Sequence, residues 1–351
     1  MPDDRQESEQ APYAGLTPDA VLDALESAGL SPDGRLLALN SYENRVYQVG
    51  MDEGAFVVAK FYRPGRWSDA QILEEHAFVG ELAQRELPVV APLAMGVNAG
   101  VNAGGNAGAG RTLCEFGGYR FAVYPRRGGR APELDRPKTL EWIGRFLGRI
   151  HAVGALRAFV ERPALDPDTF GTEPRNYLLD HGFIPPQNEA AWTSVVDHAL
   201  ASVAHCYERA GDVRRLRLHG DCHGGNVLWT ETGGDAKATG GPHFVDFDDA
   251  RTGPAVQDLW MLLSGDPAAM RVQLDQVLRG YEDFAEFDDR ELNLVEALRT
   301  LRLIHYSAWI ARRWDDPAFP AAFPWFDTPR YWQDRILELR EQIALMEEAP
   351  L

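Results

Sequence analysis

The segment "LHGDCHGGNVLW", residues 218–229, decides how the rest of the chain is interpreted. It holds one carboxylate, two histidines, a cysteine and an asparagine between apolar ends. Gly220, Gly224 and Gly225 interrupt both helical and strand periodicity, so the segment predicts a loop that leads into a strand at residues 227–229. Residue types alone leave three kinds of site open: a metal cage, a thiol active site and a phosphotransfer loop.

The spacing of three oxygen-bearing residues favours phosphotransfer. Asp221 and Asn226 stand five positions apart, and a later apolar strand containing Phe244 and Val245 delivers Asp246. Phosphoryl transfer from ATP needs a group that orients the attacking hydroxyl, and oxygen ligands that hold Mg²⁺ against the phosphates. We therefore predict Asp221 as the base, and Asn226 and Asp246 as the Mg²⁺ ligands.

A lysine in the N-terminal part completes this pattern. Lys60 lies in "FVVAKFY", residues 56–62, near the end of an apolar strand. A buried lysine needs a carboxylate partner, and the helix that follows offers Glu74 and Glu75. A Lys–Glu pair aimed at the α- and β-phosphates is the remaining part of the kinase arrangement.

The order of predicted elements indicates an α+β, bilobal, protein-kinase-like fold. Residues 1–125 are expected to form an ATP-binding lobe with a five-stranded antiparallel sheet and a helix, including strands at "VVAPLAMG" (residues 89–96) and "YRFAVYP" (residues 119–125). Residues 126–351 are expected to form a mainly helical catalytic and substrate lobe. The Gly/Asn/Ala tract at 97–110 is interpreted as a flexible loop without chemistry.

The amino-acid composition restricts the binding partners and the cellular compartment that we expect. The formal net charge of −18 disfavours nucleic acid and anionic membranes. Three scattered cysteines suit a reducing compartment, and neither a signal peptide nor an apolar run of about 20 residues is evident. We expect a cytoplasmic monomer that binds neither nucleic acid nor membrane.

Four longer motifs resemble the bacterial stress response kinase A family, within the aminoglycoside phosphotransferase and choline kinase-like branch of the protein-kinase fold. They are "HGDCHGGN", "FVDFDDARTGPAVQDLW", "LNSYENRVYQV" and "VVAKFYRPGRW". The resemblance runs from about residue 15 to residue 345. It implies a cytoplasmic kinase that uses ATP and Mg²⁺ and phosphorylates Ser and Thr of proteins in the stress response.

The resemblance adds roles for residues that spacing alone does not settle. The roles given above to Asp221, Asn226, Asp246 and Lys60 match the family pattern. Ser41 matches a phosphate-loop contact, and Glu75 becomes the better partner for Lys60 than Glu74. The backbone from Tyr124 to Arg126 is expected to form a hinge that hydrogen-bonds adenine.

Departures from ordinary protein kinases bear on the acceptor and on regulation. The loop tip "NSYEN" lacks glycine, and His223 takes the position of the lysine that follows the catalytic aspartate. For His223, contact with the γ-phosphate and structural support remain equally open. The short segment between Asp246 and Asp258 predicts no activation-loop switch, and Asp258 is expected to brace the catalytic loop through backbone N–H groups.

Other interpretations of the same residues stay in view. His219 and His223 could belong to a zinc hydrolase, but His219 is expected to be structural, and Cys222 a buried thiol rather than a nucleophile. Asp248 and Asp249 are expected to be solvated charges. The rival functions are a small-molecule kinase for an aminoglycoside, choline, another amino alcohol or a homoserine-like compound, and a nucleotide-binding pseudokinase.

Overall fold

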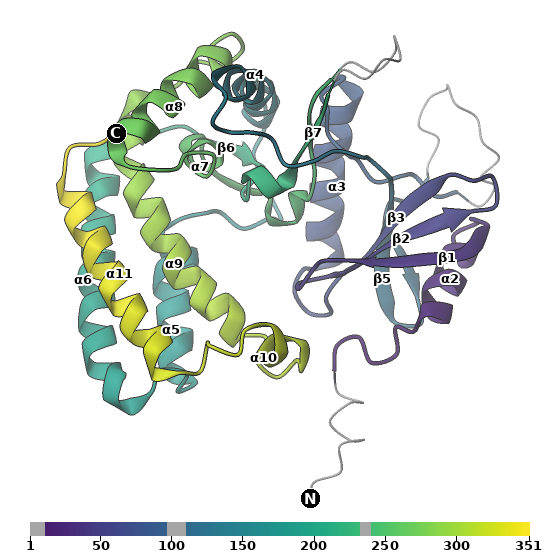
Figure 1. Ribbon diagram of the computed structural model, residues 1–351, viewed down its shortest axis with the longest axis horizontal. Helices are drawn as coiled ribbons and strands as arrows, with labels where there is room; N and C mark the ends of the chain where they lie inside the picture. Colours follow the sequence, from purple (N-terminus) through teal and green to yellow (C-terminus); the bar gives the residue numbers. More distant parts are fainter. Residues whose placement is uncertain (1–10, 97–109, 232–239) are drawn as a thin grey trace, which may run out of the picture. The chain divides into compact units, whose positions relative to one another are not determined.

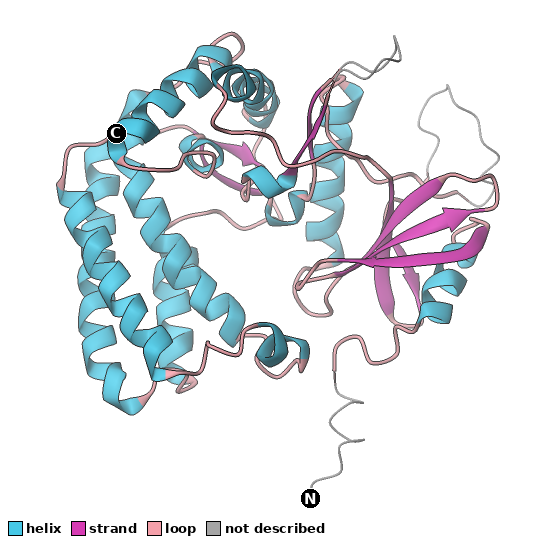
Figure 2. Ribbon diagram, viewed as in Figure 1, coloured by secondary structure: helices cyan, strands magenta, loops and turns pink. Residues whose placement is uncertain are grey.

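A computed structural model describes residues 11–96, 110–231 and 240–351 of the chain (Figure 1). The chain divides into two units: Met1–Gly129 with His243–Asp248, and Arg130–Pro242 with Asp249–Leu351. Most of the predicted flexible tract, residues 97–109, lies outside the described residues. Strands dominate the first unit and helices the second (Figure 2), as the α+β assignment predicted.

The first unit is built on a five-stranded antiparallel sheet with strand order β1-β2-β3-β5-β4. Its strands are β1 (Pro32–Leu39), β2 (Arg45–Met51), β3 (Phe56–Phe61), β4 (Cys114–Phe116) and β5 (Tyr119–Pro125). The number of strands is as predicted, but the strand predicted at residues 89–96 is wrong. That segment makes only isolated bridges, because Pro92 has no N–H to donate to a ladder.

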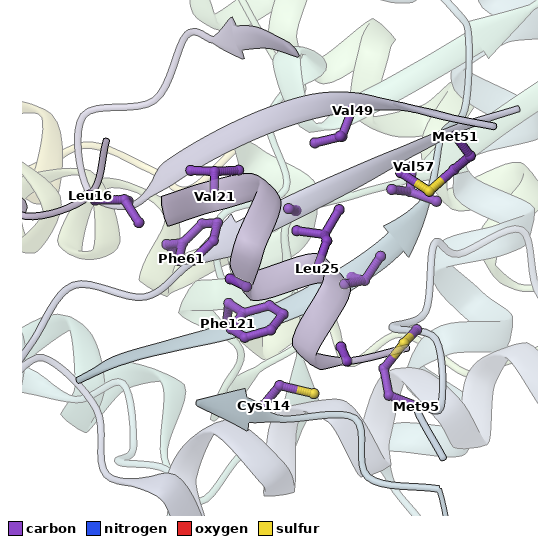
Figure 3. Close-up of a cluster of buried hydrophobic side chains, with 14 residues drawn as sticks. Leu16, Val21, Leu25, Val49, Met51, Val57, Phe61, Met95, Cys114 and Phe121 are labelled. Carbon is purple, nitrogen blue, oxygen red and sulfur yellow. The ribbon is translucent and has the colours of Figure 1, made fainter. Parts of the chain in front are cut away.

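Two helices cover opposite faces of this sheet. Helix α2 (Pro18–Ser27) begins at Thr17, whose hydroxyl accepts from Ala20 N at 3.2 Å, and α3 (Asp69–Gln84) begins with a capping box formed by Ser68 and Gln71. Figure 3 shows the core between α2 and the sheet, to which β3 contributes Val57 and Phe61. Side chains alternate along a strand, so Lys60 faces the other way, toward α3.

The segment that follows β8 (Gly241–Phe244) belongs to the first unit, although the sequence placed it in the C-terminal lobe. Phe244 N donates to Pro88 O at 2.8 Å, and Val90 N donates to Phe244 O at 3.1 Å. The ring of Phe247 packs edge-on against Phe78 of α3. These contacts fix residues 243–248 on the unit that carries Lys60.

The second unit is mainly helical. Its helices are α4 (Pro137–Gly154), α5 (Glu173–Asp180), α6 (Pro186–Ala210), α7 (Val256–Trp260), α8 (Pro267–Tyr281), α9 (Val295–Ala311), α10 (Ala318–Ala322) and α11 (Pro329–Glu347). The short turns are η1 (Asp168–Thr172), η2 (Gly224–Asn226) and η4 (Asp289–Leu294), while η3 (Phe247–Asp249) crosses from the first unit into the second. No helix in the described ranges is both long enough and apolar enough to span a bilayer.

Glycines bring α4 and α8 into backbone contact. A Cβ atom added to Gly144 would lie 2.0 Å from Val277 O, and one added to Gly280 would lie 2.0 Å from Glu141 O. Only glycine permits this spacing, because any side chain would force the helices apart. The pair supplies rigid support for the strands that carry the site.

Two short strands position the loop at residues 219–226. Strand β6 (Arg215–Leu218) pairs with β9 (Arg251–Pro254) in an antiparallel ladder. The loop leaves the end of β6 and leads through η2 into β7 (Val227–Thr230), while α7 starts directly after β9. Pairing of the two strands therefore brings the start of the loop close to α7.

Candidate active site

The loop at residues 219–226 is anchored by a buried carboxylate on α7. His219 N donates to Asp258 Oδ2, and Gly220 N donates to Asp258 Oδ1, each at 2.8 Å. Asp258 is fully buried, and its Oδ2 also lies 3.0 Å from His151 Nε2. The prediction that Asp258 braces the loop through backbone N–H groups is confirmed.

Gly220 is required where the loop turns. Its φ is +86°, and an added Cβ would lie 2.1 Å from Asp249 O. On the other side, Gln257 Nε2 donates to Gly220 O at 2.9 Å. Since both the N–H and the carbonyl of Gly220 are held by α7, the residue after it leaves the turn in a fixed direction.

That residue is Asp221, and the structure brings its carboxylate together with an arginine and a histidine side chain. Arg302 Nη1 of α9 donates to Oδ1 at 2.7 Å, and His223 Nε2 lies 3.5 Å from Oδ2. Burial would raise the pKa of Asp221, but the hydrogen bond from His223 and the charge of Arg302 hold that pKa below its ordinary value. Asp221 is therefore ionised at neutral pH.

Asn226 lies beside Asp221, as the spacing predicted. Its Nδ2 donates to Asp221 O at 2.9 Å and lies 3.4 Å from Asp221 Oδ2. Commitment of the amide nitrogen to these contacts fixes the orientation of the side chain. The amide oxygen of Asn226 then remains as an acceptor of the kind that Mg²⁺ prefers.

The histidines and the cysteine of the loop have structural partners. The ring of His219 accepts from Asp221 N at 3.4 Å, as expected for a structural residue. Cys222 is fully buried, and burial together with the charge of Asp258 raises the pKa of its thiol well above the ordinary value. His223 Nδ1 accepts from Gly225 N at 3.0 Å, so the ring caps η2, and its contact with a phosphate stays a prediction.

In the first unit, Lys60 lies between two carboxylates. Its Nζ is 2.9 Å from Asp246 Oδ1 and 3.0 Å from Asp248 Oδ1. Burial would lower the pKa of Lys60, but Asp246 and Asp248 raise that pKa well above the ordinary value. Asp246 has a φ of +59°, an unusual conformation for a residue with a side chain, and its carboxylate is 54 % exposed.

Asp248 corrects an expectation, because it is not a solvated charge. Only 4 % of the residue is exposed, and Asn44 Nδ2 donates to its Oδ2 at 3.2 Å. Arg66, from the segment between β3 and α3, forms an ion pair with the same carboxylate. The neighbouring Asp249 is partly exposed and belongs to the second unit, where it lies 3.5 Å from Arg251.

Glu75 occupies a different place from the one predicted. It is buried on α3, with Oε2 3.7 Å from His76 Nε2, and its charge contributes to the raised pKa of Lys60. The direct ion pairs of Lys60 within the described chain are with Asp246 and Asp248. The predicted ion pair between Lys60 and Glu75 is therefore not formed in this structure.

The remaining predicted nucleotide-binding residues also lie in the first unit. Tyr124, on β5, has its hydroxyl 2.9 Å from the hydroxyl of Tyr62, and Arg126 Nε donates to Gln48 Oε1 at 3.0 Å. Ser41 lies partly exposed in the loop between β1 and β2. Contact of these residues with a nucleotide stays a prediction.

Two features of the site escaped the sequence analysis. Arg302 follows Asp221 by 81 positions on a helix with no recognisable motif, so no local signal could have found it. Arg66 lies in "RPGRW", which the sequence analysis used only as part of the family resemblance. Each becomes visible only through its tertiary contact with a carboxylate.

Known proteins that are similar to this chain are phosphotransferases and kinases. A profile of the "Phosphotransferase enzyme family" matches residues 35–295. "Stress response kinase A" of Escherichia coli K12 is 45% identical over 340 residues, covering 97% of this chain and 96% of that protein. The chain belongs to the stress response kinase A family of phosphotransferases. This kinase is also 45% identical, over 339 residues, to "Serine/threonine protein kinase RdoA" of Salmonella typhimurium LT2, with 97% and 96% of the chains covered.

Solved structures with little sequence identity share the fold of this kinase. Amicoumacin kinase hAmiN, in complex with AMP-PNP, Ca²⁺ and Ami, superposes with a TM-score of 0.68 at 17% identity, covering 95% and 94% of the two chains. The microcompartment-associated aminopropanol kinase gives a TM-score of 0.64 at 17% identity, with 93% and 96% covered. The kinase-like fold predicted from the sequence is confirmed.

Proposed function

We propose that this kinase uses ATP and Mg²⁺ to phosphorylate Ser or Thr hydroxyls of proteins in the bacterial stress response. The observation that carries the proposal is the loop on which an ionised Asp221 lies beside Asn226 and is braced by Asp258. The similarity to the Salmonella serine/threonine protein kinase RdoA supports a Ser or Thr hydroxyl as the acceptor. Action in the cytoplasm as a monomer is part of the same proposal.

In this proposal the first unit binds the nucleotide. Lys60, on the α3 face of the sheet, binds the α- and β-phosphates, and Ser41 contributes a phosphate contact from the β1–β2 loop. The backbone from Tyr124 to Arg126, at the end of β5, hydrogen-bonds the adenine. Glu75 supports Lys60 as a buried negative charge rather than as a direct partner.

Asn226 and Asp246 fit a magnesium ion by the chemistry of their donors. Both offer oxygen, the ligand that Mg²⁺ prefers, and the Asn226 nitrogen is already committed to Asp221. The Asp246 carboxylate is half exposed, and among the described residues its ion-pair partner is Lys60. Mg²⁺ would supply positive charge that neutralises the phosphate oxygens during transfer.

The proposed catalytic step depends on Asp221. The carboxylate accepts a hydrogen bond from the acceptor hydroxyl and orients its oxygen toward the γ-phosphorus. The proton of that hydroxyl moves to Asp221 as the new O–P bond forms and the bond to ADP breaks. In this proposal His223, whose Nε2 lies 3.5 Å from Asp221 Oδ2, contacts the acceptor or the transferred phosphate.

A small-molecule kinase is the second candidate. His223 stands where ordinary protein kinases have lysine. The solved structures that share the fold include an amicoumacin kinase and an aminopropanol kinase. Likeness at this level of identity indicates the fold alone, so we rank this candidate below a protein acceptor.

Transfer of radiolabel from ATP tests the proposal. The purified kinase is incubated with γ-labelled ATP, Mg²⁺ and a lysate from a strain that lacks it, and in parallel with a panel of amino alcohols and aminoglycosides. We expect discrete labelled proteins with phosphoserine or phosphothreonine, and a loss of about 10²–10⁴ in rate for Asp221→Asn.

Asp197→Asn is the matched control, because this exposed aspartate of α6 pairs with Arg175 on the surface of the same unit. It should retain the wild-type rate. Turnover of a small molecule without labelled protein would replace the proposal by the second candidate. Nucleotide binding without transfer to any acceptor would indicate a pseudokinase.

A further inference from the structure

We infer that Arg302 selects the acceptor by charge, favouring a Ser or Thr in an acidic segment over cationic acceptors. The inference rests on the proposed function and specifies its acceptor. It is carried by the ion pair at 2.7 Å between Arg302 Nη1 and Asp221 Oδ1. A guanidinium thus lies on the carboxylate that the acceptor hydroxyl must reach.

The ion pair leaves one side of the Asp221 carboxylate for the acceptor. Arg302 occupies Oδ1, while the contacts of Oδ2 within the described part of the chain are longer, 3.4 Å to Asn226 Nδ2 and 3.5 Å to His223 Nε2. A carboxylate has about four lone-pair positions, so Oδ2 can still accept a hydroxyl proton. The Arg302 side chain is 43 % exposed, so its charge reaches groups that approach Asp221.

Charges around the carboxylate come from several elements. Asp249, at the end of η3, acts against ionisation of Asp221, but it also lies 3.5 Å from Arg251 of β9. His305 of α9 is uncharged at neutral pH, because burial and the charge of Arg251 lower its pKa well below the ordinary value. Arg302 is therefore the cation in direct contact with Asp221.

This arrangement disfavours an ammonium group next to the acceptor hydroxyl. In a small amino alcohol the amine lies only two or three bonds of about 1.5 Å from the hydroxyl carbon, so it would approach the guanidinium within a few ångströms. Like charges at that separation repel, and the repulsion is stronger in a partly buried site than in water. A carboxylate or phosphate at the same place would instead be attracted.

A row of side chains that begins at Arg302 on α9 offers contacts for the residues of a peptide on either side of the acceptor hydroxyl. Arg302, Tyr306 and Trp309 follow at intervals of four and three, which aligns them along one side of the helix, and Arg313 lies just beyond the helix end at Ala311. The rings of Tyr306 and Trp309 stack with centroids 5.8 Å apart, and the Arg313 guanidinium lies 4.9 Å from the Trp309 centroid. This α9 stripe has a cation at each end and flat aromatic surface between them.

The α9 stripe matches an extended acidic segment in length and charge. The seven positions from Arg302 to Trp309 rise about 10 Å along the helix, which about three extended residues span, and Arg313 follows beyond the helix end. A Ser or Thr at Asp221 would then have acidic neighbours within reach of Arg302 and Arg313. Aromatic and arginine side chains are the types that contribute most to binding in protein interfaces.

Charge-matched peptides test the inference. Three peptide pools with a central Ser or Thr carry Glu, Gln or Lys at the flanking positions, and 1-amino-2-propanol serves as a small cationic acceptor. For the wild type we expect kcat/KM at least about tenfold higher for the Glu pool than for the Lys pool. For Arg302→Gln we expect this ratio to fall to a value between about one and about three. For Arg302→Lys we expect it to stay close to the wild-type ratio.

Arg330→Gln is the matched control, because Arg330 of α11 is 89 % exposed and pairs only loosely with Asp334, at 3.8 Å. It should keep the wild-type ratio, and thermal unfolding shows whether each variant is folded. A wild-type preference for Lys peptides or for 1-amino-2-propanol, or a ratio unchanged in Arg302→Gln, would overturn the inference while leaving the enzyme a kinase. Transfer to no hydroxyl acceptor would overturn the proposed function, and the inference with it.

Discussion

Lys60 is held by two aspartates that differ in exposure. Asp248 is buried and is fixed by Asn44 and Arg66, whereas the carboxylate of Asp246 is half exposed. A buried, ion-paired carboxylate does not exchange partners easily, because loss of a partner leaves a buried charge uncompensated. We therefore interpret Asp248 as the permanent partner of Lys60, and Asp246 as the partner that is free to accept a metal ion.

Replacement of Asp248 by asparagine should destabilise the first unit. Asparagine keeps the shape but removes the charge that balances Lys60 and Arg66. Removal of one partner from a buried ion pair typically costs about 3–5 kcal/mol. We expect the free energy of unfolding, measured by urea denaturation, to fall by a similar amount. Asp249→Asn, a less buried neighbour, is the control and should change it by less than about 1 kcal/mol; equal effects would contradict the interpretation.

The close contact between helices α4 and α8 depends on glycine. We expect Gly280→Ala to lower the free energy of unfolding by about 1–3 kcal/mol or more, since the new methyl group meets Glu141 O at 2.0 Å. Gly80→Ala in α3 is the matched control, because no described atom lies within 4 Å of its added Cβ. That control should be neutral or stabilising by up to about 1 kcal/mol. Similar losses in both variants would show that the close approach is unimportant.

Another link between elements is sensitive to pH. Glu291 of η4 is 2 % exposed, and its Oε2 accepts from Val256 N of α7 at 2.8 Å. Burial raises the pKa of Glu291 from 4.5 to about 7. Because the folded state binds the proton more tightly than the unfolded state, this stabilisation is complete below about pH 4.5 and is lost as the pH rises through about 7.

Glu291→Gln should remove that pH dependence, since the amide oxygen can still accept from Val256 but does not titrate. The free energies of unfolding of variant and wild type should be similar at pH 4.5. At pH 8 the variant should be more stable, by up to about 3 kcal/mol. Chemical denaturation at both pH values measures the difference. A constant difference across this range would show that Glu291 does not titrate there.

Across the molecule, most features that were predicted correctly from the sequence depend on residues close together in the chain. The spacing of Asp221 and Asn226 reflects a single loop, in which Asn226 Nδ2 donates to Asp221 O. Bracing of the loop by Asp258 is the exception, because its hydrogen bonds from His219 N and Gly220 N span 39 and 38 positions.

The features that were missed depend on long-range packing. Asp248 and Asp249 are adjacent in sequence and identical in chemistry, yet they belong to different units and differ in burial. Arg302 contacts Asp221 only because α9 folds back against the loop, and the preference of Lys60 for Asp246 and Asp248 over Glu75 has the same origin. Periodicity and motif spacing contain no information about such contacts.

The return of His243–Asp248 to the first unit bears on how this enzyme could recombine with its relatives. A crossover near residue 129 would transfer Lys60 without the two aspartates that neutralise it. The hybrid would then combine an ammonium group from one parent with acids shaped for the other. Exchange of lobes between kinases of this type should therefore succeed only when residues His243–Asp248 come from the same parent as the N-terminal lobe.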